Sequence, residues 1–309
     1  MTDVVVVGAG LAGIACARAL AAAGLGPVVL DKGRGIGGRM ATRRVDLPAG
    51  PLRFDHGAQY VTARGPGFAE ALGHAAPWDA AHPGARVGVP GMASLPRALA
   101  EGLDVRQRVE VIALHPDGPG WRLDTTAGEM RADAVVLTVP APQVAALIGP
   151  DHPATRDLAG VRMVPCLTLM AAFPAAAPRP FATQASDTHP LAWIAQDSTK
   201  PERPATATAW VAQANPDWSA AHLEHDRDTL TALMLPLMAD RLALDPSSAL
   251  YSAAHRWRHA RVTAPLGRPF LRHGRLWLGG DWCLGARAED AWTSGTALAR
   301  DLLEACDAR

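Results

Sequence analysis

The sequence contains few of the residues that mark several common protein classes. Among its 309 residues there are only two lysines, Lys32 and Lys200, and only four cysteines, which are spread between Cys16 and Cys306. The cysteines form no CxxC pair, so we expect reduced thiols in a cytoplasmic protein rather than disulfides. There is no HExxH arrangement of histidines either, and we predict no metal site.

The sequence also lacks an excess of charge and a long uninterrupted apolar run. Acidic and basic side chains balance at 30 each, which predicts no general attraction to nucleic acid or to an anionic membrane. The most apolar stretch, Val4–Ala23, follows Asp3 and contains Arg18 and several glycines, so we predict no membrane span. The chain is long enough for two domains, while its oligomeric state is left open.

The first 31 residues are typical of a strand, a tight turn, a helix and a second strand. Asp3–Val7 and Pro27–Asp31 are apolar runs of strand length, and Leu11–Ala23 is rich in Ala and Leu with helical spacing. This order predicts two adjacent parallel strands joined by a right-handed helical crossover.

The turn between the first strand and the helix has the pattern GxGxxG, formed by Gly8, Gly10 and Gly13. The first glycine permits the tight turn, the second allows a pyrophosphate to approach the backbone, and the third allows close packing of helix on strand. The N-terminus of the helix favours phosphate, and Asp31 can accept hydrogen bonds from a ribose. We therefore predict a dinucleotide cofactor.

The remaining elements form two groups. Turn signals between Asp104 and Val139 predict a β-meander, and a second sheet is expected further along the chain. We expect a loop over Gly33–Arg44 and helices over Met92–Leu103, Pro142–Asp157, His222–Leu244 (the longest) and Ala288–Cys306. We expect strands at Arg53–Tyr60, Met163–Phe173, Leu191–Gln196, Ala205–Val211 and Leu276–Leu278.

Two further segments resemble the flavin amine oxidase superfamily. Asp31–Thr42, with Gly37-Gly38-Arg39, resembles the GGR motif that follows the dinucleotide turn in those proteins. Leu276–Asp281, ending in Gly280-Asp281, resembles their second FAD signature, and the helix with Ala291–Gly295 follows it. Three stretches resemble the renalase-type branch in particular: Gly38–Arg44, Phe54–Tyr60 and His255–Arg261.

The resemblance implies an α/β fold (α+β overall), with a topology like that of glutathione reductase 2 and p-hydroxybenzoate hydroxylase. A Rossmann-like FAD-binding domain with a β-meander would be joined to a smaller substrate domain with a mixed sheet. We assign residues 1–68, 91–155 and 257–309 to the discontinuous FAD-binding domain, and residues 69–90 and 156–256 to the substrate domain.

The resemblance also implies a reaction. Enzymes of this branch transfer a hydride from a reduced substrate to flavin N5 and then pass the electrons to O2, giving H2O2. The implied substrate is a 2- or 6-dihydro isomer of NAD(P). One alternative is an oxidase or dehydrogenase acting on a small amine or another apolar substrate. A second is a dinucleotide-binding module without catalysis.

The resemblance places the site residues as follows. Residues expected to bind FAD are Gly8, Ala9, Gly10, Leu11, Ala12, Gly13, Asp31, Lys32, Gly37, Gly38, Arg39, Met40, His56, Gly57, Ala58, Gln59, Val109, Thr138, Pro140, Gly280, Asp281, Trp282, Ala291, Trp292, Thr293 and Gly295. Trp193, Trp257 and Gln59 are candidates for the catalytic site, where two tryptophans could wall a flat substrate. No catalytic base is nominated. Amine-oxidising relatives often hold a lysine near flavin N5, and here only Lys200 could serve, in a proline-bounded loop where we expect no such role.

Overall fold

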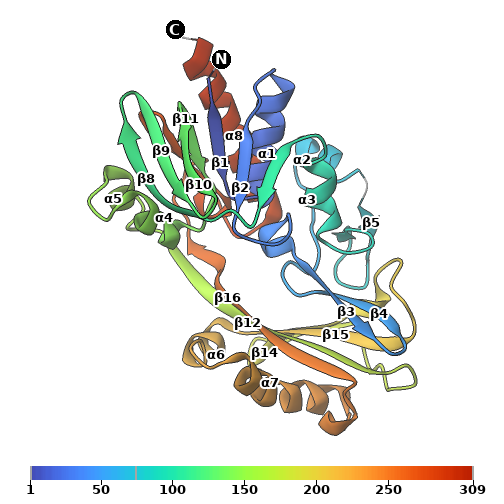
Figure 1. Cartoon of the computed structure of the whole chain (residues 1–309). Coiled ribbons are helices and arrows are strands. Elements are labelled where there is room, and N and C mark those ends of the chain that lie inside the picture. Colours follow the sequence, from blue (N-terminus) through green and yellow to red (C-terminus); the bar gives the residue numbers. More distant parts are fainter. Residues whose placement is uncertain (1, 74, 308–309) are drawn as a thin grey trace.

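The computed structural model describes residues 2–73 and 75–307, and its first sheet is built on the predicted strand–helix–strand unit (Figure 1). The six strands lie in the order β17-β18-β11-β1-β2-β7, with β1 and β2 near the centre. Pairing is parallel except between β17 and β18. The bounds are β1 (Val4–Val7), β2 (Val28–Asp31), β7 (Asp104–Gln107), β11 (Ala134–Leu137), β17 (Leu271–His273) and β18 (Leu276–Leu278).

Both faces of this sheet are covered, because its central strands are apolar on both sides. Val4 and Val6 face a core that includes helices α1 and α8, whereas Val5 and Val7 face a core that includes the β-meander and α4. The covering elements are α1 (Leu11–Ala22), α2 (Pro66–Ala71), α3 (Ser94–Leu99), β8 (Val111–Asp117), β9 (Gly120–Thr125), β10 (Gly128–Ala132), α4 (Ala141–Ile148), α5 (Pro153–Asp157) and α8 (Ala288–Asp307).

A second sheet of five strands lies beside the first, in the order β13-β14-β15-β12-β16 (Figure 1). Helix α7 packs its apolar side on one face, and the hairpin β3–β4 packs on the other. The bounds are β3 (Thr42–Leu47), β4 (Gly50–Asp55), β12 (Arg162–Pro174), β13 (Thr183–Ala185), β14 (Leu191–Gln196), β15 (Ala207–Ala214), α6 (Pro216–Ala221), α7 (Arg227–Leu242) and β16 (Tyr251–Ala264).

The fold class is confirmed, with one refinement: every pairing in the smaller sheet is antiparallel rather than mixed. The meander consists of β8, β9 and β10, while β7 at the start of the predicted meander joins the first sheet beside β2. The division of the chain into domains at residues 68, 91, 155 and 257 stays a prediction.

Several predicted elements differ in extent. The expected helix over 142–157 is two helices, because Gly149 adopts φ +88° between them and a proline begins the second. The predicted loop over 33–44 contains a short 3₁₀ turn, η1 (Gly38–Met40), and gives way to β3 at Thr42. Helix α8 has 20 residues and α7 has 16, so the expected ranking of their lengths was wrong.

The main omission from the predictions is β16, a 14-residue strand that runs beside β12 along the length of the second sheet. Short elements complete the fold: β5 (Ala76–Pro77), β6 (Arg86–Val87), η2 (Asp197–Thr199), η3 (Pro246–Ser248) and η4 (Asp281–Cys283). Over residues 2–73 and 75–307, no helix has the length and apolar character needed to cross a membrane.

Candidate active site

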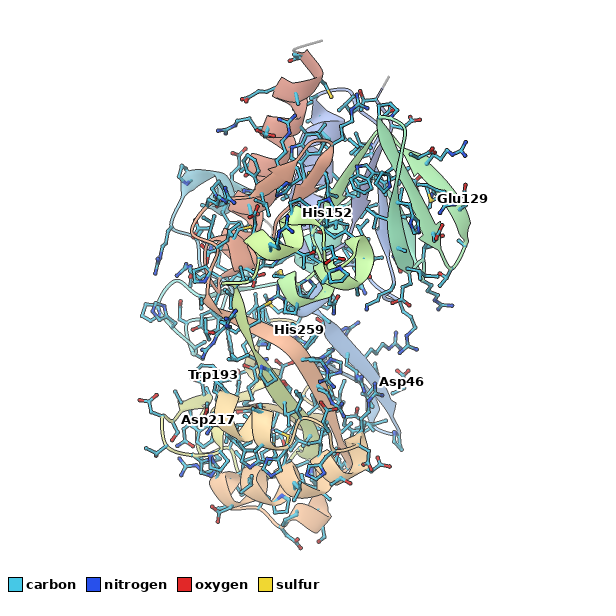
Figure 2. The ribbon with its side chains drawn as sticks, turned by 90° about the vertical axis from the view of Figure 1, so that its left-hand side faces the viewer. Asp46, Glu129, His152, Trp193, Asp217 and His259 are labelled. Carbon is cyan, nitrogen blue, oxygen red and sulfur yellow. The ribbon has the colours of Figure 1, made fainter. Side chains whose placement is uncertain are left out.

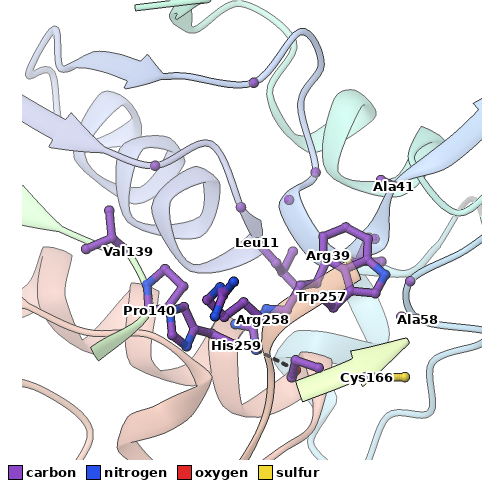
Figure 3. A pocket seen from close by; sticks show the side chains of 18 of the residues that line it. Leu11, Arg39, Ala41, Ala58, Val139, Pro140, Cys166, Trp257, Arg258 and His259 are labelled. Carbon is purple, nitrogen blue, oxygen red and sulfur yellow. Dashed lines mark hydrogen bonds between the residues drawn. The ribbon is translucent and has the colours of Figure 1, made fainter. Parts of the chain in front are cut away.

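A cavity of about 1970 Å³ lies where the carboxyl ends of β1, β2 and β11 meet the second sheet. Figure 3 shows side chains from the start of α1, the segment after β11, and β12 and β16 gathered around it. Most of the predicted cofactor residues line this cavity, and so do the two candidate tryptophans. The predicted residues on its wall are Gly8, Gly10, Leu11, Ala12, Asp31, Lys32, Gly37, Gly38, Arg39, Met40, His56, Gly57, Ala58, Val109, Thr138, Pro140, Trp193, Trp257, Gly280, Asp281 and Ala291.

The glycine turn before α1 has the local geometry that its sequence requires. Gly8 adopts φ +111°, and a Cβ on Gly13 would lie 1.9 Å from the carbonyl oxygen of Gly8. In contrast, a Cβ on Gly10 would have no atom within 4 Å. Gly10 also lines the cavity, so open space lies in front of this turn and the N-terminus of α1. This arrangement fits a diphosphate.

Asp31 fixes the backbone around this turn. One carboxylate oxygen accepts a hydrogen bond from the Ala9 amide at 2.6 Å, and the other accepts one from the Gly33 amide at 2.6 Å. The side chain therefore ties the end of β2 to the glycine turn and to the following loop. Each oxygen has a further lone pair for a ribose hydroxyl.

The GGR loop and the C-terminal motif meet through a bidentate ion pair. The two terminal nitrogens of Arg39 lie 2.7 and 2.6 Å from the two carboxylate oxygens of Asp281. Arg39 also donates to the carbonyl oxygen of Ala260 at 2.9 Å. We predicted that both residues bind FAD, and we predicted no contact between them. In the structure each fixes the orientation of the other at the cavity wall.

The segment after β4 packs directly on the GGR loop. A Cβ on Gly57 would lie 1.9 Å from the carbonyl oxygen of Arg39, and that oxygen accepts a hydrogen bond from the Ala58 amide at 2.8 Å. Only glycine can occupy position 57 without moving the backbone. The predicted motifs at Arg39, Gly57 and Asp281 therefore come together in one place.

The second sheet presents a row of side chains toward this segment. Trp193 pairs with Gln213, Gln213 with Thr168 and Thr168 with His255, so the row crosses four adjacent strands. All but the buried Thr168 line the cavity. Gln213 donates through Nε2 to the carbonyl oxygen of Gly57 at 2.7 Å, which locks the sheet to the segment after β4.

Two histidines and a tryptophan form a compact aromatic cluster beside that row. His56 stacks on Trp257 with ring centroids 5.2 Å apart, and His255 lies edge-on to both rings. Trp257 donates through Nε1 to the carbonyl oxygen of His56 at 2.8 Å. Burial, with help from nearby positive charge, lowers the pKa of His56 to about 3 and that of His255 to about 4. Both imidazoles are therefore neutral near pH 7 and can act as hydrogen-bonding groups.

Seven predicted residues do not line the cavity: Ala9, Gly13, Gln59, Trp282, Trp292, Thr293 and Gly295. Gln59 donates instead to the backbone carbonyl oxygens of Asp55 and Gly57, so it stabilises the loop rather than facing a substrate. Gly295 permits the contact of α8 with α1, because a Cβ there would lie 2.2 Å from the carbonyl oxygen of Ala12. Thr293 points to solvent.

The wall of the cavity is strongly cationic. Among the described residues, ten basic side chains line it but only three carboxylates, and each carboxylate is engaged: Asp31 with backbone amides, Asp281 with Arg39, and Glu110 with Lys32 at 3.6 Å. Four more of the cations pair with carboxylates outside the wall: Arg44 with Asp46, Arg256 and Arg258 with Glu224, and Arg287 with Glu289. The basic side chains are Lys32, Arg34, Arg39, Arg43, Arg44, Arg97, Arg256, Arg258, Arg261 and Arg287.

Two arginines of β16 on this wall, Arg258 and Arg261, differ in their partners. Arg258 forms a two-pronged ion pair with Glu224 at 2.7 and 3.0 Å. Within the described residues, Arg261 forms no ion pair. This excess of positive charge favours an anionic ligand in addition to the diphosphate of a cofactor.

Lys200 is buried outside the cavity wall. Its ammonium lies 2.9 Å from Asp55 and 2.6 Å from Asp197, and Arg203 contacts the same two carboxylates. All four side chains are at most 1% exposed. Burial raises the pKa of Asp55, but Lys200 and Arg203 outweigh it and the net pKa is lowered, whereas burial raises that of Asp197. The expectation that Lys200 plays no part at the flavin agrees with this position.

The residues on the wall that the predictions did not name as site residues include Cys166, Gln213 and His255. The strand β16 carried a usable signal, because aromatic or imidazole residues and arginines alternate from His255 to His259, as expected of a strand with two different faces. Cys166 and Gln213 carried none. Burial raises the pKa of the Cys166 thiol to about 11, so it stays protonated and is a poor nucleophile.

Comparison with known proteins identifies the family. Residues 68–303 match the family described as flavin containing amine oxidoreductase, and residues 6–72 match a NAD(P)-binding Rossmann-like domain. The first match spans most of the chain, so the protein belongs to the flavin-containing amine oxidoreductases. It is a FAD-dependent oxidoreductase, and this sets aside the alternative of a binding module without catalysis.

Solved structures agree in fold. A redesigned putrescine oxidase has a TM-score of 0.74 at 14% identity, and a putative protoporphyrinogen oxidase from Exiguobacterium sp. 255-15 has 0.76 at 15% identity. In both comparisons 98% of this chain and 99% of the other chain are covered. Cyclohexylamine oxidase from Brevibacterium oxydans IH-35A has a TM-score of 0.72 at 14% identity, with 99% of each chain covered. At these identities the similarity concerns the fold.

Proposed function

We propose that this enzyme belongs to the renalase-type branch and oxidises a 2- or 6-dihydro isomer of NAD(P). The observation that carries the proposal is the cavity wall, on which every carboxylate is already engaged. Four arginines on this wall form no ion pair among the described residues: Arg34, Arg43, Arg97 and Arg261. A dinucleotide substrate brings phosphate groups that such a wall attracts, whereas a protonated amine would be repelled by it.

The chain's own residues would hold the cofactor along the cavity. Gly8, Gly10 and the N-terminus of α1 would receive the diphosphate, and Asp31 would receive a ribose. Arg39 and Asp281, which are held in place by their ion pair, would lie beside the ribityl chain of FAD, between its diphosphate and its ring. When bound, flavin accepts a hydride and passes its electrons to O2, giving H2O2.

The second sheet would orient the substrate. Trp193 and Trp257 offer flat apolar surfaces for a nicotinamide ring, and neutral His56 and His255 offer hydrogen-bonding nitrogens without a charge. A dihydropyridine releases a hydride without first losing a proton, so orientation is the main requirement and no base is needed. The absence of a free carboxylate among the described residues of the wall is compatible with such a substrate.

Oxidation of a small amine is the second candidate, because the matched family is named for it. An amine must reach the flavin uncharged and is usually positioned by a carboxylate or an aromatic cage. Lys200, the one lysine that could have served near the flavin, is instead committed to two buried carboxylates. The wall therefore favours the dihydronicotinamide over the amine.

Anaerobic reduction of the purified holoenzyme separates the two candidates. Mixing with 2- or 6-dihydro-NAD(P) should bleach the visible absorbance of the flavin within one turnover, and admission of air should restore it with formation of H2O2. Ordinary NAD(P)H, which is the 4-dihydro isomer, serves as a comparison donor. Putrescine and cyclohexylamine serve as comparison amines. Bleaching by an amine, and by neither isomer, would replace our proposal with the second candidate.

A further inference from the structure

A second cavity, of about 450 Å³, lies along the outer edge of β16. Strand β16 is the last strand of the five-stranded sheet, so this edge has no neighbouring strand. The start of α7 forms one side, and Arg43 reaches in from β3 on the other. The cavity is lined by Arg43, Arg227, Asp228, Thr231, Ala232, Leu235, Ser252, Ala253 and Ala254.

Arg43 belongs to the walls of both cavities, and it therefore connects them. His255, on the wall of the main cavity, directly follows Ala253 and Ala254 on the wall of the second. Burial lowers the pKa of His255, and the positive charges of Arg43 and Arg227 lower it further. The two cavities therefore adjoin at Arg43 and along β16.

Among the residues that the structure describes, neither Arg43 nor Arg227 forms an ion pair. Asp228 is the only carboxylate on the second cavity's wall, and it is exposed to solvent. A guanidinium has five donors in a planar fork that matches the oxygens of a phosphate.

The hydroxyls in this cavity differ in availability. Thr231 is fully used, since its oxygen donates to the Arg227 carbonyl oxygen at 2.8 Å and accepts from the Ala254 amide at 2.9 Å. These two hydrogen bonds fix the start of α7 against β16, and they hold the backbone of Arg227 in place. Within the described part of the chain, Ser252 makes no side-chain hydrogen bond and is free to donate to a ligand.

We propose that the second cavity binds the phosphate-bearing tail of the substrate whose ring lies in the main cavity. This inference rests on the proposed function and assigns Arg227 as a specificity-determining residue. The ring and the tail would lie on opposite sides of Arg43, with His255 between them. Arg227 would add to the affinity for phosphorylated substrates and would leave the hydride transfer itself unchanged.

The test compares the Arg227→Gln variant with the wild-type holoenzyme on two donors. One is the 2- or 6-dihydro-NAD(P) isomer, and the other is the corresponding dihydronicotinamide riboside, which has no phosphate. Loss of one charge-assisted hydrogen bond of about 1.5 kcal/mol predicts a KM for the dinucleotide raised about tenfold, with kcat unchanged. KM for the riboside should not change. Arg179→Gln, which removes an exposed arginine outside both cavities, is the matched control.

Direct binding of AMP and of inorganic pyrophosphate, measured by calorimetry, supplies a readout that does not depend on turnover. Both should bind the wild type, compete with the dinucleotide but not with the riboside, and bind Arg227→Gln about tenfold more weakly. An equal effect of the variant on both donors, or none on either, overturns the inference. Binding of AMP without competition would show a free-phosphate site unrelated to the substrate and would also overturn it.

The same measurements distinguish a failure of this inference from a failure of the proposed function. If neither isomer reduces the flavin, the proposed function fails, whatever the calorimetry shows. If both donors are oxidised and the variant does not discriminate between them, the function stands and only the phosphate site is lost.

Discussion

Two groups of charged side chains in this molecule are arranged in opposite ways. Around Lys200, two cations and two carboxylates are buried together, and each positive charge contacts a negative one. On the wall of the main cavity, four of the ten cations, Arg34, Arg43, Arg97 and Arg261, form no ion pair among the described residues. Figure 2 shows Trp193 and His259, both on the cavity wall, near the level where the two halves of the molecule meet.

The difference separates charges that hold the fold from charges that await a ligand. A buried charge without a partner is very costly, so the cluster around Lys200 must be balanced within the protein. A charge on a cavity wall keeps contact with water and can remain unbalanced until an anion binds. The balance of charge around a group of residues thus indicates whether its partner is another part of the chain or a ligand.

Breaking the balanced cluster should have the largest effect on stability. Lys200→Met leaves two buried carboxylates with one arginine, and removal of one partner from such a group costs about 3–5 kcal/mol. Chemical denaturation of the holoenzyme should show this loss in the free energy of unfolding. Arg131→Gln breaks an exposed ion pair with Asp117 and should cost about 0–1 kcal/mol. Similar losses for both variants would show that the cluster does not stabilise the fold as we infer.

Filling the space in front of the glycine turn should remove the cofactor without unfolding the chain. A Cβ at Gly10 meets no protein atom within 4 Å, so Gly10→Val should fold yet bind FAD at least ~100-fold more weakly. Flavin content after purification and fluorescence titration of the apoprotein measure this. Gly26→Val, which also adds a side chain in open space but outside the cavity, is the control. Full flavin content in Gly10→Val would exclude this turn as the diphosphate site.

Acid should destabilise the fold through His56 and His255, which are neutral near pH 7. Their pKa values of about 3 and about 4 lie below the ordinary 6.5, so below that pH the unfolded chain binds protons that the folded chain does not. Stability present above pH 6.5 is therefore lost as the pH falls toward 4. The melting temperature of His255→Asn should fall less steeply with acid than that of the wild type. Parallel curves for the two proteins would show that His255 does not titrate differently on unfolding.

Removing an unbalanced cation should have the smallest effect. Within the described residues Arg261 has no ion-pair partner, so Arg261→Gln should change the free energy of unfolding by no more than about 0.5 kcal/mol. Steady-state kinetics at low salt should show a KM for the dinucleotide raised about two- to fivefold, and added salt should reduce this difference. A loss of stability as large as that of Lys200→Met would abolish the distinction between the two groups.

The sequence was most informative where function depends on neighbouring residues. The spacing of Gly8, Gly10 and Gly13 between a strand and a helix predicted the β1–α1–β2 unit of the first sheet, and two of these glycines line the cavity, because a backbone turn is a local event. The extended strand β14 and the short strand β18 were also placed at their observed bounds.

Contacts across long stretches of sequence could not be predicted in the same way. Arg39 and Asp281 are 242 positions apart, and nothing in either motif shows that they pair. The row from Trp193 to His255 depends on the register of four strands, one of which was missed, and a slip of one residue would turn these side chains to the other face. Lys200 and Asp55, which form an ion pair, are 145 positions apart.

The pairing of Arg39 with Asp281 also has a consequence for biosynthesis. A ribosome adds about 5–20 residues per second, so the 242 positions between the two side chains take on the order of ten to fifty seconds to make. Throughout that interval the glycine turn and the GGR loop exist without β18, η4 and α8, which complete the sheet, the ion pair and the packing of α1. The newly made chain cannot assemble its cofactor site during synthesis of the middle of the protein, and capture of FAD belongs to the final stage of folding.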